Sequence, residues 1–352
     1  MERLEHTWTA LVTPFTAEMD LDWSGYDKLV AFQMEQGISG LLPVGTTGES
    51  PTLSWDEHNG LIDRVIRTAH GKRPVLAGTG SNATHEAITH SLRAAHEGAD
   101  AVLMVDCYYN GPSSAELRDH YYAAVAARIP DTLVVPYVIP GRTGTALEVA
   151  DLALLAARHP NITTVKEATG DLERMRQTRA LCGEAFSIMS GDDDRTFAMM
   201  ADPQIRANGV ISVMSNVAPA TISRMVTLLA AGQLDEASQV RDALAPLFSI
   251  VTVKTPNVRT LPDGSQITVE DRYRNPLPVK TLMAGLGMPA GGCREPLGRM
   301  STAGVNTVRQ AAAQVWQHAP WVLEPIEAHF GVCIAERLAD DSVWNALAAQ
   351  EG

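Results

Sequence analysis

The chain has 352 residues, of which 45% are hydrophobic and 20% charged, a composition of folded proteins rather than disordered ones. Its formal net charge of −13 argues against nucleic acid and anionic membranes as partners. No apolar run approaches the ~18 residues of a membrane span, and the first residues do not resemble a secretion signal. The four cysteines are widely spaced, so we expect a cytoplasmic protein without a disulfide framework.

Short apolar runs typical of buried strands recur eight times along the chain. They comprise residues 10–12, 40–44, 74–77, 101–105, 133–137, 162–165, 186–189 and 209–213. Segments with helical periodicity separate them, for example Asp56–Ala69 and Thr84–Glu97. Continuously apolar strands are buried on both faces, as in a parallel sheet covered by helices. The pattern predicts an α/β protein, a (β/α)₈ TIM barrel over residues 1–231, in preference to an open doubly wound sheet.

Residues 232–352 predict a separate C-terminal helical region. Helical stretches occupy residues 234–250, 280–286 and 302–317, and a tail follows from residue 320. The polar segment 251–274 contains Pro256, Pro262 and Asp263-Gly264, which indicates an inserted loop or hairpin. We expect this insertion and the tail to be surface or subunit-contact elements, with capping of the barrel as the alternative.

Lys166 is the most informative single residue. It follows the sixth apolar run, at the strand end where a barrel places its catalytic groups. Lysine is rarely buried unless it is paired, so one interpretation is an ion pair with Glu167 or a solvated strand end. The other is a Schiff-base lysine, whose amine must be neutral to attack a carbonyl. Apolar surroundings would lower its pKa from the ordinary value of ~10.4.

Two further strand ends carry polar groups. The second run leads into Gly-Thr-Thr-Gly-Glu-Ser at residues 45–50, where backbone N–H groups and hydroxyls could face an anion. The fifth run leads to Tyr137, a phenol able to relay protons, and to Arg142, able to hold a carboxylate with two donors. The structural alternatives are an ordinary turn, a buried tyrosine and a surface arginine.

Metal binding is disfavoured by the sequence. The ten histidines form neither His-x-His nor His-Glu-x-x-His. Asp192-Asp193-Asp194 could hold a cation, but acidic residues at a helix start more often cap the helix.

Taken together, these motifs resemble the pyruvate-dependent class I aldolases typified by dihydrodipicolinate synthase, within the N-acetylneuraminate lyase superfamily. Asn275–Lys280 also resembles the C-terminal helical region of that family. Seven motifs in family order are far more specific than any one of them. The matching segments are Leu11–Phe15, Gly45–Ser50, Tyr108–Asn110, Tyr137–Thr143, Val165–Gly170, Ser190–Asp193 and Gly209–Val213.

The resemblance implies a Schiff-base lyase that needs no metal or organic cofactor. Lys166 would form an imine with pyruvate, and the resulting enamine would attack an aldehyde. Tyr137 would relay protons, hydrogen-bonded to Thr46 and to a tyrosine from a neighbouring subunit, here Tyr109. Because Tyr108 and Tyr109 are adjacent and point in different directions, we expect at most one of them to face the same cavity as Tyr137 and the other to pack.

The resemblance also implies the substrate-binding residues. Thr46 and Thr47 would hold the pyruvate carboxylate, and the backbone at Gly191 and Ile211 would line the pocket. Arg142 would orient the carboxylate of L-aspartate 4-semialdehyde, which favours synthesis of 4-hydroxy-tetrahydrodipicolinate for lysine and diaminopimelate. The alternatives are an aldolase or dehydratase acting on a keto-deoxy sugar acid or N-acetylneuraminate, and a non-catalytic keto-acid-binding paralogue.

Regulation and assembly follow from the same resemblance. Family members inhibited by lysine bind it at a subunit interface, and an ordinary polar interface is the alternative here. A homotetramer is the family default, with a homodimer as the alternative. The positions that match the lysine site are Ser50, Trp55, His58, Asn82, Glu86 and Tyr108.

One departure from the family pattern precedes the tyrosine pair. Asp106-Cys107 stands where the family usually has Thr-Pro. We expect the strand end to be freer there, with a thiol near the interface tyrosines.

Overall fold

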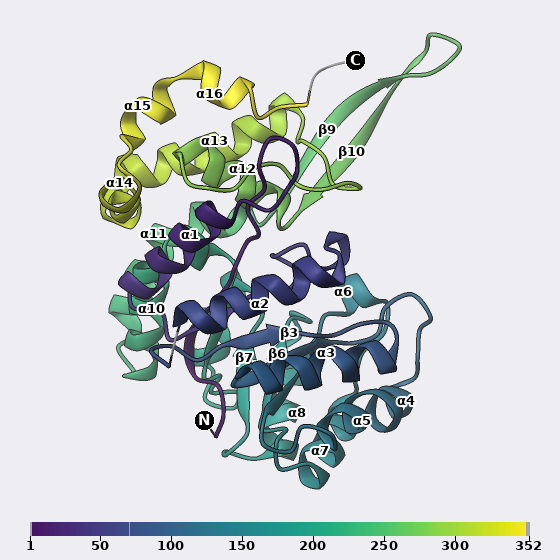
Figure 1. The fold of residues 1–352 in the computed structure, drawn as a ribbon. Helices are drawn as coiled ribbons and strands as arrows, with labels where there is room; N and C mark the ends of the chain where they lie inside the picture. The colour runs from purple at the N-terminus through teal and green to yellow at the C-terminus, as the bar shows by residue number, and fades with distance from the viewer. Residues whose placement is uncertain (1, 70, 350–352) are drawn as a thin grey trace.

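A computed structural model describes residues 2–69 and 71–349. Eight parallel strands form one sheet in the order β2-β1-β8-β7-β6-β5-β4-β3. A parallel bridge between Leu41 and Val75 joins its two edges, so the predicted TIM barrel is confirmed (Figure 1). The strands are β1 (His6–Ala10), β2 (Gly40–Leu42), β3 (Leu76–Gly78), β4 (Ala101–Val105), β5 (Leu133–Val138), β6 (Thr164–Glu167), β7 (Ser187–Ser190) and β8 (Gly209–Ser212).

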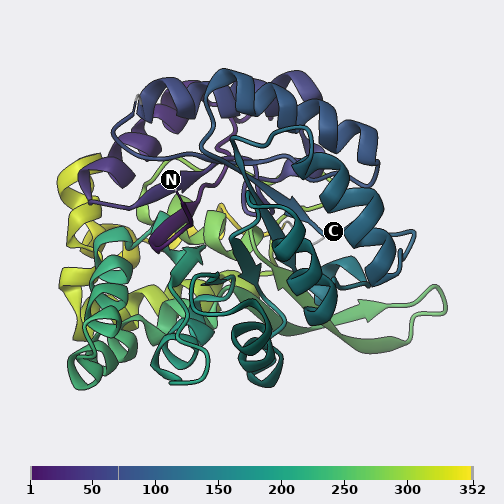
Figure 2. The same ribbon diagram turned by 90° about the horizontal axis from the view of Figure 1, so that it is seen from below.

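Helices surround the strands, as Figure 2 shows from below. The predicted helices at 56–69 and 84–97 are present, the first beginning one residue earlier. Those of the barrel are α1 (Trp23–Glu35), α2 (Trp55–Ala69), α3 (Thr84–Glu97), α4 (Ser114–Glu116), α5 (Ala123–Ala126), α6 (Pro140–Thr143), α7 (Val149–Arg158), α8 (Leu172–Cys182), α9 (Thr196–Ala201) and α10 (Pro219–Ala230).

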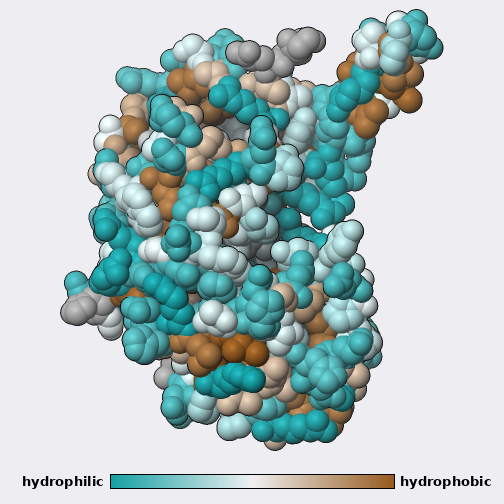
Figure 3. Space-filling model, turned by 45° about the vertical axis from the view of Figure 1, so that its right-hand side comes forward, coloured by the Kyte–Doolittle hydropathy of each residue, from teal (hydrophilic) through white to brown (hydrophobic). Residues whose placement is uncertain are grey.

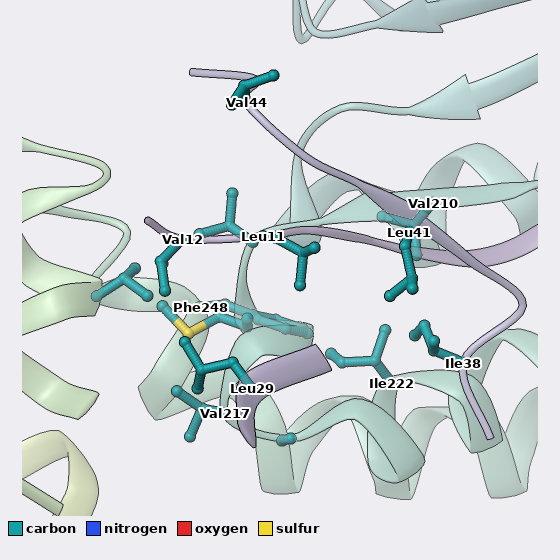
Figure 4. Close-up of a cluster of buried hydrophobic side chains, with 14 of the residues drawn as sticks. Leu11, Val12, Leu29, Ile38, Leu41, Val44, Val210, Val217, Ile222 and Phe248 are labelled. Atoms are coloured by element: carbon teal, nitrogen blue, oxygen red, sulfur yellow. The ribbon is translucent and has the colours of Figure 1, made fainter. Parts of the chain in front are cut away.

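Alternation along each strand divides the core into two layers. In β5, Leu133, Val135 and Tyr137 point into the barrel, whereas Val134 and Val138 pack outward against the helices. Figure 4 shows part of the outer layer, where Leu41 and Val210 of the strands lie near the side chains of the surrounding helices. Burial on both faces explains why the strands read as continuous apolar runs.

The first strand was predicted in the wrong place. It spans His6–Ala10 rather than residues 10–12, and its threonines interrupt the apolar pattern. Thr9 is fully buried because its hydroxyl donates to Gln33 Oε1 of α1 at 2.6 Å. Leu11 and Val12 follow the strand and belong to the outer core layer.

Most of the C-terminal part packs above the barrel in Figure 1, and it consists mainly of helices. Within the described residues, no helix is long and apolar enough to cross a membrane. The division at residue 231 stays a prediction. The helices are α11 (Leu234–Ser249), α12 (Leu277–Leu286), α13 (Thr302–His318), α14 (Glu324–Phe330), α15 (Ile334–Ala339) and α16 (Asp341–Asn345).

The inserted segment 251–274 forms a β-hairpin. Its antiparallel strands β9 (Thr252–Thr260) and β10 (Gln266–Arg274) pair over their whole length, from Thr252 opposite Arg274 to Thr260 opposite Gln266. The hairpin extends away from the body, and Figure 3 shows a hydrophilic stem with hydrophobic side chains near the tip. Its base lies beside the barrel opening, which makes it more than a surface element.

Candidate active site

A cavity of about 190 Å³ opens at the C-terminal ends of the barrel strands, where barrels carry their active sites. We call it the lysine cavity. The predicted site residues that line it are Thr46, Thr47, Tyr137, Arg142, Lys166 and Gly191. The structure thus brings together residues that are widely separated in the chain.

Lys166 lies inside this cavity, with only 5% of its surface exposed. Its Nζ atom lies 4.3 Å from the centroid of the Tyr137 ring. Burial lowers the pKa of Lys166 to about 8, although the charges of Asp192 and Asp193 act to raise it. At that pKa about a tenth of the amine is neutral at pH 7. A neutral amine is the form that attacks a carbonyl.

The alternative ion pair between Lys166 and Glu167 is absent. Strand alternation sends Glu167 to the opposite face of β6, where its carboxylate pairs with Arg174 of α8 at 3.2 Å. Among the described residues, Lys166 forms no salt bridge. The solvated strand end is also wrong, because the side chain is buried.

Tyr137 supplies a buried phenol beside the lysine. Burial raises its pKa above the ordinary value, while Arg142 and the Thr46 hydroxyl act in the opposite direction. The phenol therefore stays protonated near neutral pH. Thr46, Tyr137 and Arg142 all line a second cavity as well, so they stand between the two.

Asn275, which sequence analysis quoted only as part of a motif, completes one wall of the lysine cavity. Its Nδ2 donates to Thr47 Oγ1 at 3.0 Å, and its carbonyl oxygen accepts a hydrogen bond from Arg142 Nη2 at 2.9 Å. Its buried Oδ1 has no hydrogen-bond partner among the described residues.

The acidic run 192–194 serves two different purposes. Asp193 is buried and accepts hydrogen bonds from Ser212 Oγ and from the N–H groups of Val213 and Met214, which holds the end of β8. Asp192 faces the cavity, and burial raises its pKa to about 6. In the part of the chain that the structure describes, no group of three or more acidic, His or Cys residues could hold a metal.

Two predicted backbone positions differ in their placement. A Cβ at Gly191 would lie 2.7 Å from Ala168 Cβ and 3.3 Å from Lys166 Cε, so only glycine leaves the lysine its space. Ile211 lies fully buried in the barrel interior, and Val213 lines the cavity at the end of β8 instead.

A second cavity of about 220 Å³ adjoins the first, and we call it the tyrosine cavity. Tyr108 and Ser50 line it. Tyr109 lies outside both cavities, with 94% of its surface exposed and a left-handed backbone conformation (φ 82°). Of the adjacent pair, then, Tyr108 lines one of the two cavities of the described chain and Tyr109 lines neither.

The remaining residues matched to a lysine site lie near the tyrosine cavity. Asn82 Oδ1 accepts from the Tyr108 N–H at 2.7 Å, and Glu86 accepts from Ser81 Oγ at 2.5 Å. Trp55 stacks on a histidine that sequence analysis missed, His90, with ring centroids 3.4 Å apart.

His58 packs against the edge of Trp55 at 5.0 Å between ring centroids. Burial lowers the pKa of His58 to about 4, so its imidazole is neutral near pH 7. Neither ring nitrogen has a hydrogen-bond partner among the described residues.

The expectation of a freer strand end at Asp106-Cys107 is wrong. Asp106 is buried and accepts hydrogen bonds from Tyr122 OH at 2.5 Å and from the Leu147 N–H at 3.2 Å. Cys107 is also buried, with Sγ 3.7 Å from the Ser81 carbonyl oxygen. These contacts take the place of the restraint that a proline ring would provide.

Comparison with known proteins identifies the family. A model of the dihydrodipicolinate synthetase family matches residues 3–269. A 4-hydroxy-tetrahydrodipicolinate synthase of Cellvibrio japonicus is 40% identical over 309 residues, which cover 88% of this chain and 98% of the relative. The chain belongs to the dihydrodipicolinate synthetase family.

Solved structures of dihydrodipicolinate synthases share the fold. The chloride-inhibited enzyme from Acinetobacter baumannii, complexed with pyruvate, aligns with a TM-score of 0.79 and 33% identity over 88% of this chain and 98% of its own. The enzyme from Cyanidioschyzon merolae, with lysine bound, aligns with the same TM-score, identity and coverage. Membership in this family confirms a lyase of the class I aldolase type.

Proposed function

We propose that this chain condenses pyruvate with L-aspartate 4-semialdehyde to give 4-hydroxy-tetrahydrodipicolinate, through an imine on Lys166. The observation that carries the proposal is a buried lysine without a salt-bridge partner among the described residues, facing a cavity at the barrel opening. The relatives named above support the choice of reaction.

The first half of the reaction uses the neutral amine of Lys166. Nζ attacks C2 of pyruvate, and loss of water leaves an imine, whose protonated form draws electrons away from C3. Loss of a proton from C3 then gives an enamine. The pyruvate carboxylate lies against the hydroxyls of Thr46 and Thr47, and Asn275 orients the second of these.

The second half joins two carbon atoms. C3 of the enamine attacks the aldehyde carbon, and the aldehyde oxygen takes a proton as the new bond forms. Tyr137 relays this proton, because its phenol is protonated and borders both cavities. Attack of the substrate's amino group on C2 then closes the ring and releases Lys166.

We also propose that Tyr109 of the partner subunit enters the tyrosine cavity and completes the relay beside Tyr137. Two observations support this: the exposed side chain of Tyr109 and the open space next to Tyr137. Tyr109→Phe should lower kcat without preventing assembly, as measured by steady-state kinetics and sedimentation. Unchanged kcat would contradict this role.

Lysine is the proposed feedback inhibitor, binding beside Trp55, His58 and Glu86 near the tyrosine cavity. Glu86 offers a carboxylate to an ammonium group, and among the described residues its one hydrogen-bond partner is the Ser81 hydroxyl. Glu86→Gln should abolish inhibition by lysine while leaving the uninhibited rate in place. Inhibition of equal strength in the variant would contradict the site.

Trapping and turnover test the main proposal. Borohydride reduction with pyruvate, followed by peptide mass spectrometry, should place the adduct on Lys166 and not on the other buried lysine, Lys280. Steady-state assays should then show consumption of the semialdehyde. No adduct would point to a keto-acid-binding protein, and an adduct with turnover of only keto-deoxy sugar acids would point to another aldolase.

A further inference from the structure

The base of the hairpin supplies two arginines to the lysine cavity. Arg272 and Arg274 line it together with Val251 and Thr252 at the start of the hairpin. They lie two residues apart on β10 and therefore on the same face of the ribbon. Tyr273, on the opposite face, accepts a hydrogen bond from the Ser301 N–H beside α13 at 3.1 Å. Packing of Tyr273 thus turns the two arginines toward the barrel.

These arginines are tied to the loop that carries Arg142. Arg274 Nη1 donates to the Gly141 carbonyl oxygen at 2.9 Å, while Arg142 Nη2 donates to the Asn275 carbonyl oxygen at 2.9 Å. The loop after β5 and the end of β10 are therefore joined by two reciprocal hydrogen bonds. The positive charges of Arg274 and Arg272 add to partial burial in lowering the pKa of Arg142.

The residues that line the cavity carry mostly positive charges, although the protein as a whole has a formal net charge of −13. Lys166 and three arginines line the cavity, against the single carboxylate of Asp192. Among the described residues, none of these three arginines forms a salt bridge. The hairpin's other basic residues do: Lys254, the register partner of Arg272, pairs with Glu270 at 3.0 Å, and Arg259, nearer the tip, pairs with Asp271 at 2.5 Å. The positive charges of the hairpin that lack a salt bridge to the described residues are thus the two that line the cavity, Arg272 and Arg274.

We propose that Arg272 and Arg274 are positioning residues that, together with Arg142, bind the carboxylate of the second, aldehyde-bearing substrate. The inference rests on the proposed condensation and assigns a specificity role to the inserted hairpin. Guanidinium groups suit this task because they present several donors in a plane and hold carboxylates in two-point contacts. Their positive potential also attracts an anionic substrate from solution.

The arginines act on the second substrate rather than on pyruvate. Pyruvate must reach Lys166, which is buried, whereas Arg272 is exposed and Arg274 half-buried. Pyruvate's carboxylate has the hydroxyls of Thr46 and Thr47 near the lysine. A carboxylate on the incoming aldehyde would still lie at the rim when the aldehyde carbon reaches the enamine.

Steady-state kinetics of three variants test this role. Arg272→Ala and Arg274→Ala should each raise KM for the semialdehyde about tenfold, because each variant loses a charge-assisted hydrogen bond to the substrate carboxylate. Tenfold corresponds to about 1.4 kcal/mol. Arg272→Glu should raise it further. KM for pyruvate and the yield of the trapped Lys166 adduct should stay at the wild-type values. Added salt should raise KM for the semialdehyde more in the wild type than in the variants. Salt screens the attraction between the arginines and the substrate carboxylate, and the variants lack part of that attraction.

Arg259→Gln is the matched control, because it removes an arginine from the same hairpin at a position that does not line the cavity. It should leave KM for the semialdehyde unchanged. Arg272→Ala removes a side chain that makes no hydrogen bond to the described residues, so it should not disturb folding.

Equal KM values in the wild type and Arg272→Glu would overturn the inference while leaving the proposed reaction intact. Absence of semialdehyde turnover in the wild type would instead overturn the proposed function. A rise in KM for pyruvate equal to that for the semialdehyde would assign the arginines to general attraction of anions, against the specific role.

Discussion

Tyr137 and Lys166 are direct register partners on the neighbouring strands β5 and β6. Both side chains point into the barrel, so the phenol ring and the amine meet with 4.3 Å between Nζ and the ring centroid. The sheet's own hydrogen bonding thus sets the distance between the proposed nucleophile and the proposed proton relay. Rigid strands fix the geometry of such a pair more accurately than loops would.

Lys166→Met should abolish imine formation and raise stability. At pH 7 the unfolded chain binds the lysine proton with an ordinary pKa of 10.5, whereas the folded pKa is about 8. The folded state therefore bears a cost of roughly 3 kcal/mol, at about 1.4 kcal/mol per pKa unit. Denaturant unfolding should show a gain of about 1–3 kcal/mol. A loss of several kcal/mol would contradict this account.

Lys280→Met should lower the free energy of unfolding, although Lys280 is buried like Lys166. Its Nζ donates to Glu49 Oε1 at 2.6 Å and to the Thr13 carbonyl oxygen at 2.8 Å. Removal of the amine leaves a buried carboxylate without its partner, which costs about 3–5 kcal/mol. The same unfolding experiment compares the two variants, and equal effects would show that pairing does not distinguish these lysines.

The rate of imine formation should rise with pH and level off above about pH 8. The pKa of Lys166 is lowered to about 8, so the reactive neutral amine increases about tenfold per pH unit below that value. Quenched mass spectrometry of the pyruvate adduct between pH 6 and 9 measures this profile. A midpoint near 10 would mean that burial does not lower the pKa of the amine.

Asp192→Asn should move that profile to lower pH. The Asp192 carboxylate raises the pKa of Lys166, so its removal favours the neutral amine. Imine formation at pH 7 should therefore become faster, and the midpoint should fall below 8. Asp194→Asn is the control, because Asp194 is exposed and does not line the cavity. A midpoint that rises in Asp192→Asn would contradict the assigned sign.

Tyr137→Phe should separate imine formation from turnover. The variant keeps the ring beside Lys166 but loses the hydroxyl, and proton relays contribute about 10²–10⁴-fold to rates. We expect kcat to fall within that range while pyruvate is still trapped on Lys166. Full turnover by the variant would remove Tyr137 from the relay.

Much of the barrel is predictable because burial on both faces gives each strand a continuous apolar run. The exception is β1, where Thr9 is buried against Gln33 and breaks the pattern. Such a pair is invisible in sequence because the partner lies on another element. The turn residues of the hairpin are recognisable in the sequence. Its long, regular strand pairing is not, because the strands are largely polar and exposed and so lack an apolar pattern.

The site residues that sequence predicts lie at strand ends, where the topology of the barrel alone brings their side chains together. Asn275 and Arg274 lie far along the chain, and only the packing of the C-terminal part carries them to the cavity. Sequence alone cannot distinguish the neighbours Asp192 and Asp193. The structure shows that Asp192 lines the cavity, whereas Asp193 accepts hydrogen bonds from the backbone at the end of β8. His90 gave no signal, since a single histidine on a helix has many uses.

The hydrogen bond between Asn275 and Thr47 joins residues 228 positions apart and binds the barrel opening to the segment just after the hairpin. The proposed imine-forming side of the cavity thus belongs to the strands, whereas the hairpin supplies the two arginines proposed to bind the second substrate. A change of charge at the base of the hairpin would therefore alter the preferred second substrate while the lysine and its tyrosine stay in place on the strands.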